Sequence, residues 1–240
     1  MSALALLPFS LLRHRGEESY PGIGEEKEFT EQAWQEKRQE MVEEQIVARG
    51  IKEPLVLKAL EKVPRHQFVP PRERYLAYID SALSIGYQQT ISQPYIVAYM
   101  TEKAEIKAED KVLEVGTGCG YQAAILGEIA KEVYSIEIIH PLAEEAQKIL
   151  RKLGYQNIHI KVGDGYQGWS EKGPYDAIIV TAAPDHIPPA LIEQLAVGGK
   201  MIIPVGEEYQ EIVIVTKKVE GIKQQRTIPV RFVPLTRKIS

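Results

Sequence analysis

The sequence contains a single cysteine, Cys119, among 240 residues. It therefore has no partner for an internal disulfide and no multi-cysteine zinc site. None of the five histidines shows a metal-ligand spacing such as His-x-x-x-His, so we expect no metal. Basic residues are not in excess either, because 29 Lys and Arg face 33 Asp and Glu, for a formal net charge of −4. That balance argues against a nucleic-acid partner, whose phosphates normally select a basic protein.

Long apolar runs are missing as well. Residues 3–12 are apolar but are interrupted by Pro8, and they are far too short to span a bilayer, so we expect no membrane association. A secretory signal carries its positive charge before the apolar run and a small-residue cleavage site after it. Here Arg13 and Arg15 follow the run, and no Ala-x-Ala motif occurs. We interpret residues 1–29 as a poorly ordered leader of a cytoplasmic protein, with an unusual signal peptide as the alternative.

The full chain, with 44% hydrophobic and 26% charged residues, has the composition of a soluble globular protein, and we expect one α/β domain over residues 30–240. Thr30 is placed to cap a helix over 31–49 that ends at Gly50, and Pro54 opens a second helix. Together with a helix over 94–105, these elements predict a helical cap and substrate segment over residues 30–110.

From residue 111 onward, strand and helix patterns alternate, which predicts a doubly wound, mostly parallel sheet of about seven strands over residues 111–240. The expected strands are 111–115, 132–136, 158–162, 177–181, 200–204, 211–217 and 229–233. The expected helices between them are 121–130, 141–153 and 187–195.

The first of these strands runs into a glycine-rich loop with the pattern Glu-x-Gly-x-Gly-x-Gly, formed by Glu114, Gly116, Gly118 and Gly120. Glycines at a strand-to-helix turn let the backbone pass close to a ligand. A dinucleotide loop has the pattern Gly-x-Gly-x-x-Gly, and its last position falls on Tyr121 here. The spacing therefore favours an uncharged nucleoside-plus-amino-acid ligand such as S-adenosylmethionine over a nicotinamide dinucleotide.

Polar residues also stand at the carboxyl ends of the next strands, where open α/β sheets bind ligands. Glu137 ends the second strand and can accept both hydroxyls of a ribose. Asp164, between Gly163 and Gly165, ends the third and can accept from an adenine amino group, while small residues follow the fourth from Thr181 onward. Taken singly these are ordinary turn residues, but in this order they predict a nucleoside site.

A second polar segment lies upstream, at residues 86–94. Thr90 and Ser92 can place hydroxyls and backbone N–H groups where an anionic substrate would rest. The alternative for Ser92 is that it caps the helix starting at Pro94. Cys119, at a predicted helix N-terminus, is either a thiol with a lowered pKa or simply a small residue that fits the loop.

Several runs together resemble the protein-L-isoaspartate O-methyltransferases, over most of the chain from Trp34 onward. The runs are 63–70, 86–95, 114–121, 163–166, 178–184 and the closing Phe232-Val233-Pro234-Leu235-Thr236. The resemblance implies a Rossmann-like S-adenosylmethionine-dependent methyltransferase fold. It also implies methyl transfer to the free α-carboxylate of L-isoaspartyl residues in damaged proteins. The ester would then collapse to a succinimide, whose hydrolysis returns part of the material to aspartate, and S-adenosyl-L-homocysteine would be the second product.

The same resemblance assigns roles to individual positions. Ser92 takes the place of the active-site serine, and the cofactor-contacting positions correspond to Gln89, Thr90, Ile91, Glu114, Glu137, Asp164, Gly165 and Thr236, beside the three loop glycines. An isoaspartyl α-carboxylate has a pKa of roughly 3–4, so at neutral pH it is already a nucleophile and needs no general base. We therefore expect Ser92 to orient the carboxylate.

Three other functions remain open at this level. The first is a nicotinamide-dependent dehydrogenase, and the second is a non-catalytic protein-binding module that keeps the cofactor fold. The third is a methyltransferase acting on a different carboxylate or on a small molecule. We expect a monomer whose partners are isoaspartyl-containing proteins and peptides.

Overall fold

The computed structural model describes residues 29–237. The expected leader, residues 1–29, and its signal-peptide alternative thus lie outside the described residues except for Phe29. Among residues 29–237, no helix is both long enough and apolar enough to cross a membrane.

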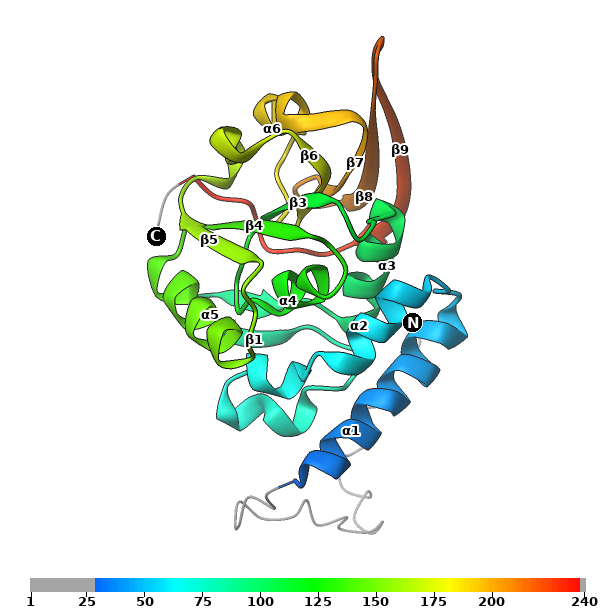
Figure 1. Cartoon of the computed structure of the whole chain (residues 1–240), viewed down its shortest axis with the longest axis vertical. Coiled ribbons are helices and arrows are strands. Elements are labelled where there is room, and N and C mark those ends of the chain that lie inside the picture. Colours follow the sequence, from blue (N-terminus) through cyan, green and yellow to red (C-terminus); the bar gives the residue numbers. More distant parts are fainter. Residues whose placement is uncertain (1–28, 238–240) are drawn as a thin grey trace, which may run out of the picture.

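A seven-stranded sheet in the order β5-β4-β3-β6-β7-β8-β9 forms the centre of the molecule (Figure 1). The first five strands in that order are parallel, and β8 and β9 are added antiparallel to β7 at one edge. Their bounds are β3 Lys111–Val115, β4 Glu132–Glu137, β5 Ile158–Val162, β6 Tyr175–Val180, β7 Leu195–Val205, β8 Gln210–Lys218 and β9 Gly221–Val230. The predicted doubly wound, mostly parallel sheet is confirmed.

Both faces of the sheet are covered, and the central strands direct successive residues alternately into two apolar cores. Helices α3 (Pro94–Ala104), α4 (Tyr121–Gly127) and α5 (His140–Lys152) cover one face, and the short α6 (Pro189–Gln194) lies on the other (Figure 1). In β3, for example, Val112 packs into the first core while Leu113 packs into the second.

The N-terminal helices pack beneath α3 and α4 (Figure 1). The first runs as α1 (Glu31–Glu40), a π-helical turn η1 (Met41–Ile46) and a 3-10 turn η2 (Val47–Arg49). As predicted, the Thr30 hydroxyl accepts from the N–H of Ala33 at 3.2 Å, and Gly50 ends the helix in the left-handed region at φ 92°. The second helix is α2 (Pro54–Lys62), followed by the 3-10 turns η3 (Arg65–Phe68) and η4 (Pro71–Leu76).

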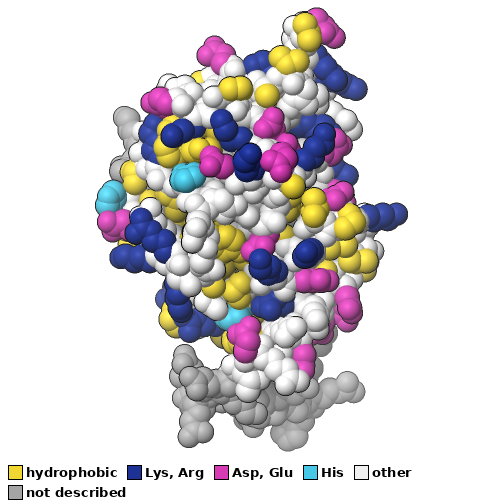
Figure 2. All heavy atoms as spheres, viewed as in Figure 1, with side chains coloured by type: hydrophobic (Ala, Val, Ile, Leu, Met, Phe, Trp, Pro, Cys, Tyr) yellow, Lys and Arg dark blue, Asp and Glu magenta, His cyan; other side chains and the backbone are white. Residues whose placement is uncertain are grey.

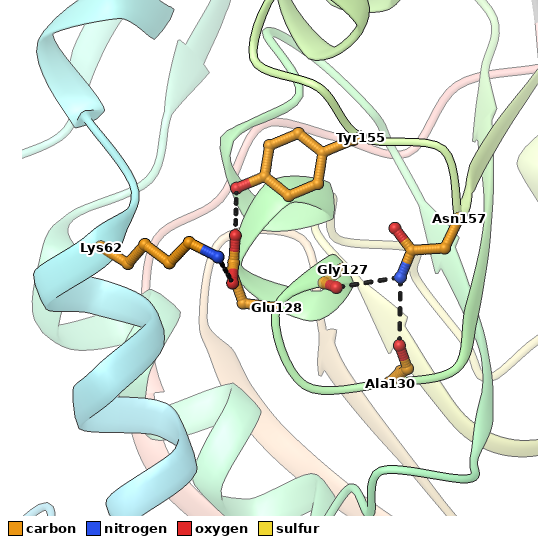
Figure 3. A network of polar contacts seen from close by, with 6 residues as sticks. All are labelled: Lys62, Gly127, Glu128, Ala130, Tyr155 and Asn157. Atoms are coloured by element: carbon orange, nitrogen blue, oxygen red, sulfur yellow. Dashed lines mark hydrogen bonds and ion pairs between the residues drawn. The ribbon is translucent and has the colours of Figure 1, made fainter.

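A polar network ties this helical part to the sheet (Figure 3). The Glu128 carboxylate accepts from Lys62 Nζ at 2.6 Å and from the Tyr155 hydroxyl at 2.9 Å. Asn157 donates its side-chain amide to the carbonyls of Gly127 at 2.9 Å and Ala130 at 3.1 Å. These contacts join α2, the end of α4 and the loop that enters β5. Helix α4 ends at Gly127 rather than at the predicted residue 130. The carbonyls of Gly127 and Ala130, which no longer accept within a helix, accept from Asn157 instead.

Two further expectations about secondary structure are corrected. The last strand is Gly221–Val230 and not 229–233. It is an edge strand paired only with β8, so its polar residues from Lys223 to Arg226 can be exposed on both faces. Because these residues are polar, the strand shows no apolar pattern in the sequence. A short hairpin, β1 (Leu83–Gly86) with β2 (Gln89–Ile91), was not expected. Its turn places Tyr87 and Gln88 at φ 51° and 58°, a conformation usually signalled by Asn or Gly.

Candidate functional site

The strand order reverses beside β3, because the chain passes through β4 to β5 on one side and then returns to β6 on the other. Crevices for ligands form at such reversal points, beyond the carboxyl ends of the strands. A cavity lies there, lined by the ends of β3 and β4, by the segments after β5 and β6, by β2 and by the C-terminal segment. Its lining residues are Gln89, Thr90, Val115, Gly116, Gly118, Ile136–Ile139, Gly165, Thr181, Ala182 and Val233–Thr236. We call it the first cavity.

Close backbone approach at the mouth of the first cavity requires glycine at position 116. Gly116 adopts φ 98°, and a Cβ on it would collide with the Thr181 hydroxyl. That hydroxyl donates to the carbonyl of Gly116 at 2.6 Å, so the segment after β6 is held directly against the loop after β3. Glycine at the first loop position is thus required by the close contact with Thr181, and the predicted approach of a ligand stays a prediction.

Glu137 is the charged group of the first cavity. It ends β4, is 6% exposed, and accepts from the N–H of Gly118 at 2.7 Å and from that of Ile139 at 2.9 Å. A carboxylate offers about four acceptor positions, so one on each oxygen remains for a ligand. This geometry suits a bound ribose diol, as the sequence predicted.

Asp164 and Gly165 contribute differently to the site. The Asp164 carboxylate accepts from the N–H of Tyr166 at 2.9 Å and so caps the turn η5 (Gly165–Gln167). Gly165 lines the cavity, and a Cβ at this position would meet Val115 Cγ1 at 2.5 Å. Asp164 therefore shapes the turn that brings Gly165 close to β3, without lining the cavity itself.

Glu114 lies beneath the cavity rather than in its wall. It is fully buried, accepts from the Ser135 hydroxyl, and has one oxygen without a partner within residues 29–237. Ser135 also shares a hydrogen bond of 2.5 Å with the Thr117 hydroxyl in the glycine loop. Burial and the nearby Glu137 carboxylate raise the pKa of Glu114 to about 8, against the opposing Ser135 hydrogen bond. At neutral pH Glu114 is therefore mostly a neutral acid that supports the loop through Ser135.

Of the two interpretations of Cys119, the small residue that fits the loop is the one the structure favours, and the thiol with a lowered pKa is wrong. Cys119 is 9% exposed, and burial raises the pKa of its thiol to about 11. Burial raises the thiol pKa by more than the position at the helix N-terminus lowers it. The sequence pattern alone could not show how deeply the thiol is buried.

A second cavity adjoins the first and contains Ser92. Thr90, Thr181 and Val233 line both cavities and so form the passage between them. The other lining residues are Asp80, Ser81, Ala82, Gln93, Ile96, Pro229, Val230, Arg231 and Phe232. The expected capping role of Ser92 is wrong, because Pro94 opens α3 and Gln93 is its N-cap, without a side-chain hydrogen bond. Within residues 29–237 the Ser92 hydroxyl is thus not used by the helix and is available to a ligand.

The C-terminal segment after β9 crosses back over the sheet (Figure 1). Its residues line both cavities. It pairs with the segment after β6, where the N–H of Ala183 donates to the carbonyl of Val233 and the N–H of Leu235 donates to that of Ala183, both at 2.8 Å. This pairing places Thr236 in the wall of the first cavity.

The structure thus separates the expected site residues into three groups. Gln89, Thr90, Gly116, Gly118, Glu137, Gly165 and Thr236 line the first cavity, and Ser92 lines the second together with Thr90. Ile91, Glu114, Gly120 and Asp164 support the walls without lining either cavity. Sequence reasoning missed Arg231, an exposed cation beside Ser92, although it directly precedes the Phe232–Thr236 run that carries part of the resemblance.

The residues of the first cavity fit an adenosine attached to an amino acid. The paired acceptors of Glu137 suit a ribose, and the close approaches at Gly116 and Gly165 leave room for flat or extended groups beside the backbone. Among residues 29–237, no lysine or arginine lines this cavity, and Glu137 places a carboxylate in it. Among residues 29–237, no group of three or more His, Cys, Asp or Glu side chains could hold a metal ion.

Comparisons with known proteins agree with this geometry. The sequence profile of the family "Protein-L-isoaspartate(D-aspartate) O-methyltransferase (PCMT)" matches residues 36–240. A protein-L-isoaspartate O-methyltransferase of Picosynechococcus sp. is 60% identical over 198 residues, which cover 82% of this chain and 89% of that protein. One from Synechococcus sp. is 50% identical over 240 residues, covering 95% of this chain and 98% of that protein.

Solved structures show the same similarity. A protein-L-isoaspartate O-methyltransferase superposes with a TM-score of 0.75 at 28% identity, covering 83% of this chain and 65% of that one. A Plasmodium falciparum protein assigned as a beta-aspartate methyltransferase, in complex with S-adenosyl-L-homocysteine, has a TM-score of 0.74 at 26% identity, covering 84% of this chain and 99% of that one. The chain described here belongs to the protein-L-isoaspartate O-methyltransferase family.

Proposed function

We propose that this protein is an S-adenosylmethionine-dependent repair methyltransferase that methylates the free α-carboxylate of L-isoaspartyl residues in damaged proteins. The observation that carries the proposal is the junction of the two cavities. One contains the acceptors for a ribose, the other contains the Ser92 hydroxyl, and Thr90, Thr181 and Val233 line both. In this proposal residues 30–240 act as one domain, with 30–110 as the cap and substrate segment and 111–240 as the cofactor-binding sheet.

The first cavity is assigned to the cofactor. S-adenosylmethionine would supply an electrophilic methyl group there. Glu137 would accept from the ribose, while Gly116, Gly118 and Gly165 would let the ligand lie against the backbone. Gln89, Thr90 and Thr236 would close the cavity from the opposite side, and Ile91, Glu114, Gly120 and Asp164 would hold these walls in position.

The second cavity is assigned to the substrate carboxylate. That carboxylate is ionised at neutral pH, so the residues of the second cavity need only to bind it, orient it and exclude part of its water. Ser92 offers one neutral donor, which orients the carboxylate without holding its negative charge as tightly as a buried cation would. Arg231 lies at the same cavity but is exposed, so water screens its charge. This arrangement suits attraction of an anionic peptide followed by orientation at a hydroxyl.

The partners we propose are isoaspartyl-containing proteins and peptides, with no nucleic acid or membrane involved. Basic and acidic side chains alternate over the face shown in Figure 2, and they form no continuous basic surface there. We also propose that the protein is a monomer and that it acts in the cytoplasm.

The direct test is methyl transfer from labelled S-adenosylmethionine to two peptides of identical sequence, one with L-isoaspartate and one with L-aspartate at the same position. We expect the label only on the first peptide, with a base-labile ester and later a succinimide. Equal labelling of both peptides, or labelling of small carboxylic acids in place of either, would assign the site to a different substrate.

A further inference from the structure

The side chain of Arg65 is completely buried at the start of η3, at the centre of the helical part. Its guanidinium donates through Nε to the carbonyl of Ala77 at 2.7 Å and through Nη2 to the carbonyl of Ser92 at 2.7 Å. Its Cζ lies 4.7 Å from the centre of the Tyr121 ring. One planar group therefore contacts three segments that are far apart in the sequence.

A buried guanidinium is a costly way to connect these segments. None of the ion pairs formed within residues 29–237 involves Arg65, and its Nη1 has no hydrogen-bond partner there. Burying a cation without a carboxylate disfavours the folded state, and an apolar side chain of similar volume is often at least as stable in such a place. Stability alone therefore gives a poor reason for arginine at this position.

The three contacts share a location that gives a better reason. Ala77 begins the stretch that leads to Asp80 in the wall of the second cavity, and Ser92 lies in the same wall. Tyr121 is the first residue of α4 and directly follows the glycine loop of the first cavity. The rigid fork of arginine can hold two carbonyls in a fixed relative position while its face packs on an aromatic ring, which lysine cannot do.

We propose that Arg65 is a positioning residue for methyl transfer. Through the carbonyl of Ser92 it fixes the position of the Ser92 hydroxyl relative to the glycine loop, and through the carbonyl of Ala77 it fixes the stretch that leads to Asp80 in the substrate cavity. This inference rests on the proposed function, because it assigns Arg65 to the alignment of the carboxylate with the methyl group. Arg65 itself touches neither ligand cavity.

The test uses the variants Arg65→Met and Arg65→Lys with Arg38→Met as the matched control. Arg38 is also buried, at 7% exposure, and donates to the Glu61 carbonyl at 2.6 Å and to the Tyr78 hydroxyl at 3.3 Å, but it does not contact Ser92. We expect Arg65→Met to lower kcat on an isoaspartyl peptide by about 10²-fold, since a misplacement of about 1 Å costs that much. Arg65→Lys should recover only part of this loss, and Arg38→Met should stay within about threefold of the wild-type kcat.

Two further measurements distinguish positioning from a loss of folding. The dissociation constant for S-adenosyl-L-homocysteine, measured by calorimetry, should change by less than about threefold in Arg65→Met, because the first cavity remains formed. Hydrogen exchange should become faster in residues 89–97 of Arg65→Met and Arg65→Lys, and not in those residues of Arg38→Met. If Arg65→Met does not fold, kcat and hydrogen exchange of Arg65→Lys are compared with those of Arg38→Met instead.

Unchanged kcat in the Arg65 variants, or exchange at residues 89–97 equal to that of the Arg38 control, overturns the inference. The exchange measurement needs no substrate. It therefore decides whether Arg65 holds the Ser92 segment even if the wild-type protein methylates no isoaspartyl peptide, a result that would refute the proposed function separately.

Discussion

The buried carboxyl of Glu114 makes the stability of this protein depend on pH in a direction that Glu114→Gln should abolish. Ionisation of Glu114 is opposed by complete burial, and its pKa is raised from 4.5 to about 8 in the folded protein. A group whose pKa is raised by folding binds its proton more tightly in the folded state. The folded state therefore loses stability as pH rises above 4.5, and the loss levels off above pH 8.

The size of the effect follows from the shift. Each pKa unit corresponds to about 1.4 kcal/mol, so Glu114 removes up to about 5 kcal/mol of unfolding free energy between acid and mildly alkaline pH. A glutamine has nearly the same shape and can still accept from Ser135, but its amide N–H groups then need an acceptor, which costs about 1–3 kcal/mol. Glu114→Gln should therefore be less stable than wild type at pH 5 and more stable at pH 8.5.

The assay is urea unfolding of both proteins, without cofactor, at several pH values from 5 to 8.5. Other titrating groups are common to both chains and cancel in the difference of the two unfolding free energies. The exposed Glu220→Gln variant removes a carboxyl from the surface and serves as the control for the loss of a buried one. A difference between Glu114→Gln and wild type that stays constant over this pH range would refute the reasoning.

The remaining predictions concern the two cavities, the thiol and the polar network. Ser92→Ala should lower kcat by roughly 10²-fold with little change in affinity for S-adenosyl-L-homocysteine; wild-type turnover would remove the orienting role. Glu137→Gln should weaken S-adenosyl-L-homocysteine binding by about 10-fold or more in calorimetry, because hydrogen bonds to a charged acceptor are replaced by neutral ones, and an unchanged dissociation constant would move the ribose elsewhere. Cys119 should resist iodoacetamide at pH 8 in the native protein and react after unfolding, since its pKa is about 11; rapid native labelling seen by mass spectrometry would contradict its burial. Glu128→Ala should lower Tm, by an amount corresponding to about 1–3 kcal/mol, because it leaves the Tyr155 hydroxyl without its acceptor, and a Tm equal to that of wild type would show that the network in Figure 3 contributes nothing.

Much of the fold was predictable because parallel strands buried on both faces appear as short apolar runs. The run at β3 followed by Gly116 and Gly118 signalled both the sheet and the first cavity. Glu137 was also predictable, since the end of a strand next to such a loop has few alternative positions in space. These features depend on local pattern and on topology, which the sequence expresses directly.

The features that escaped prediction depend on tertiary contacts. The raised pKa of Cys119 comes from burial that no local pattern records, and the same holds for Glu114. The predicted cap at Ser92 is one residue too early, because α3 begins at Pro94 and its N-cap is Gln93. Arg65 belongs to the run 63–70 that carries part of the resemblance, but its contacts were not predictable, since its carbonyl partners lie 12 and 27 positions away along the chain.

The central claim is that two adjoining cavities hold the cofactor and the substrate carboxylate on either side of Thr90, Thr181 and Val233. A crystal structure with S-adenosyl-L-homocysteine and an L-isoaspartyl peptide tests it most directly. We predict the ribose hydroxyls on Glu137, the sulfur directed at the passage between the cavities, and the peptide α-carboxylate within hydrogen-bond distance of Ser92 Oγ. Adenosine bound outside the first cavity, or an α-carboxylate that does not approach Ser92, would contradict the claim.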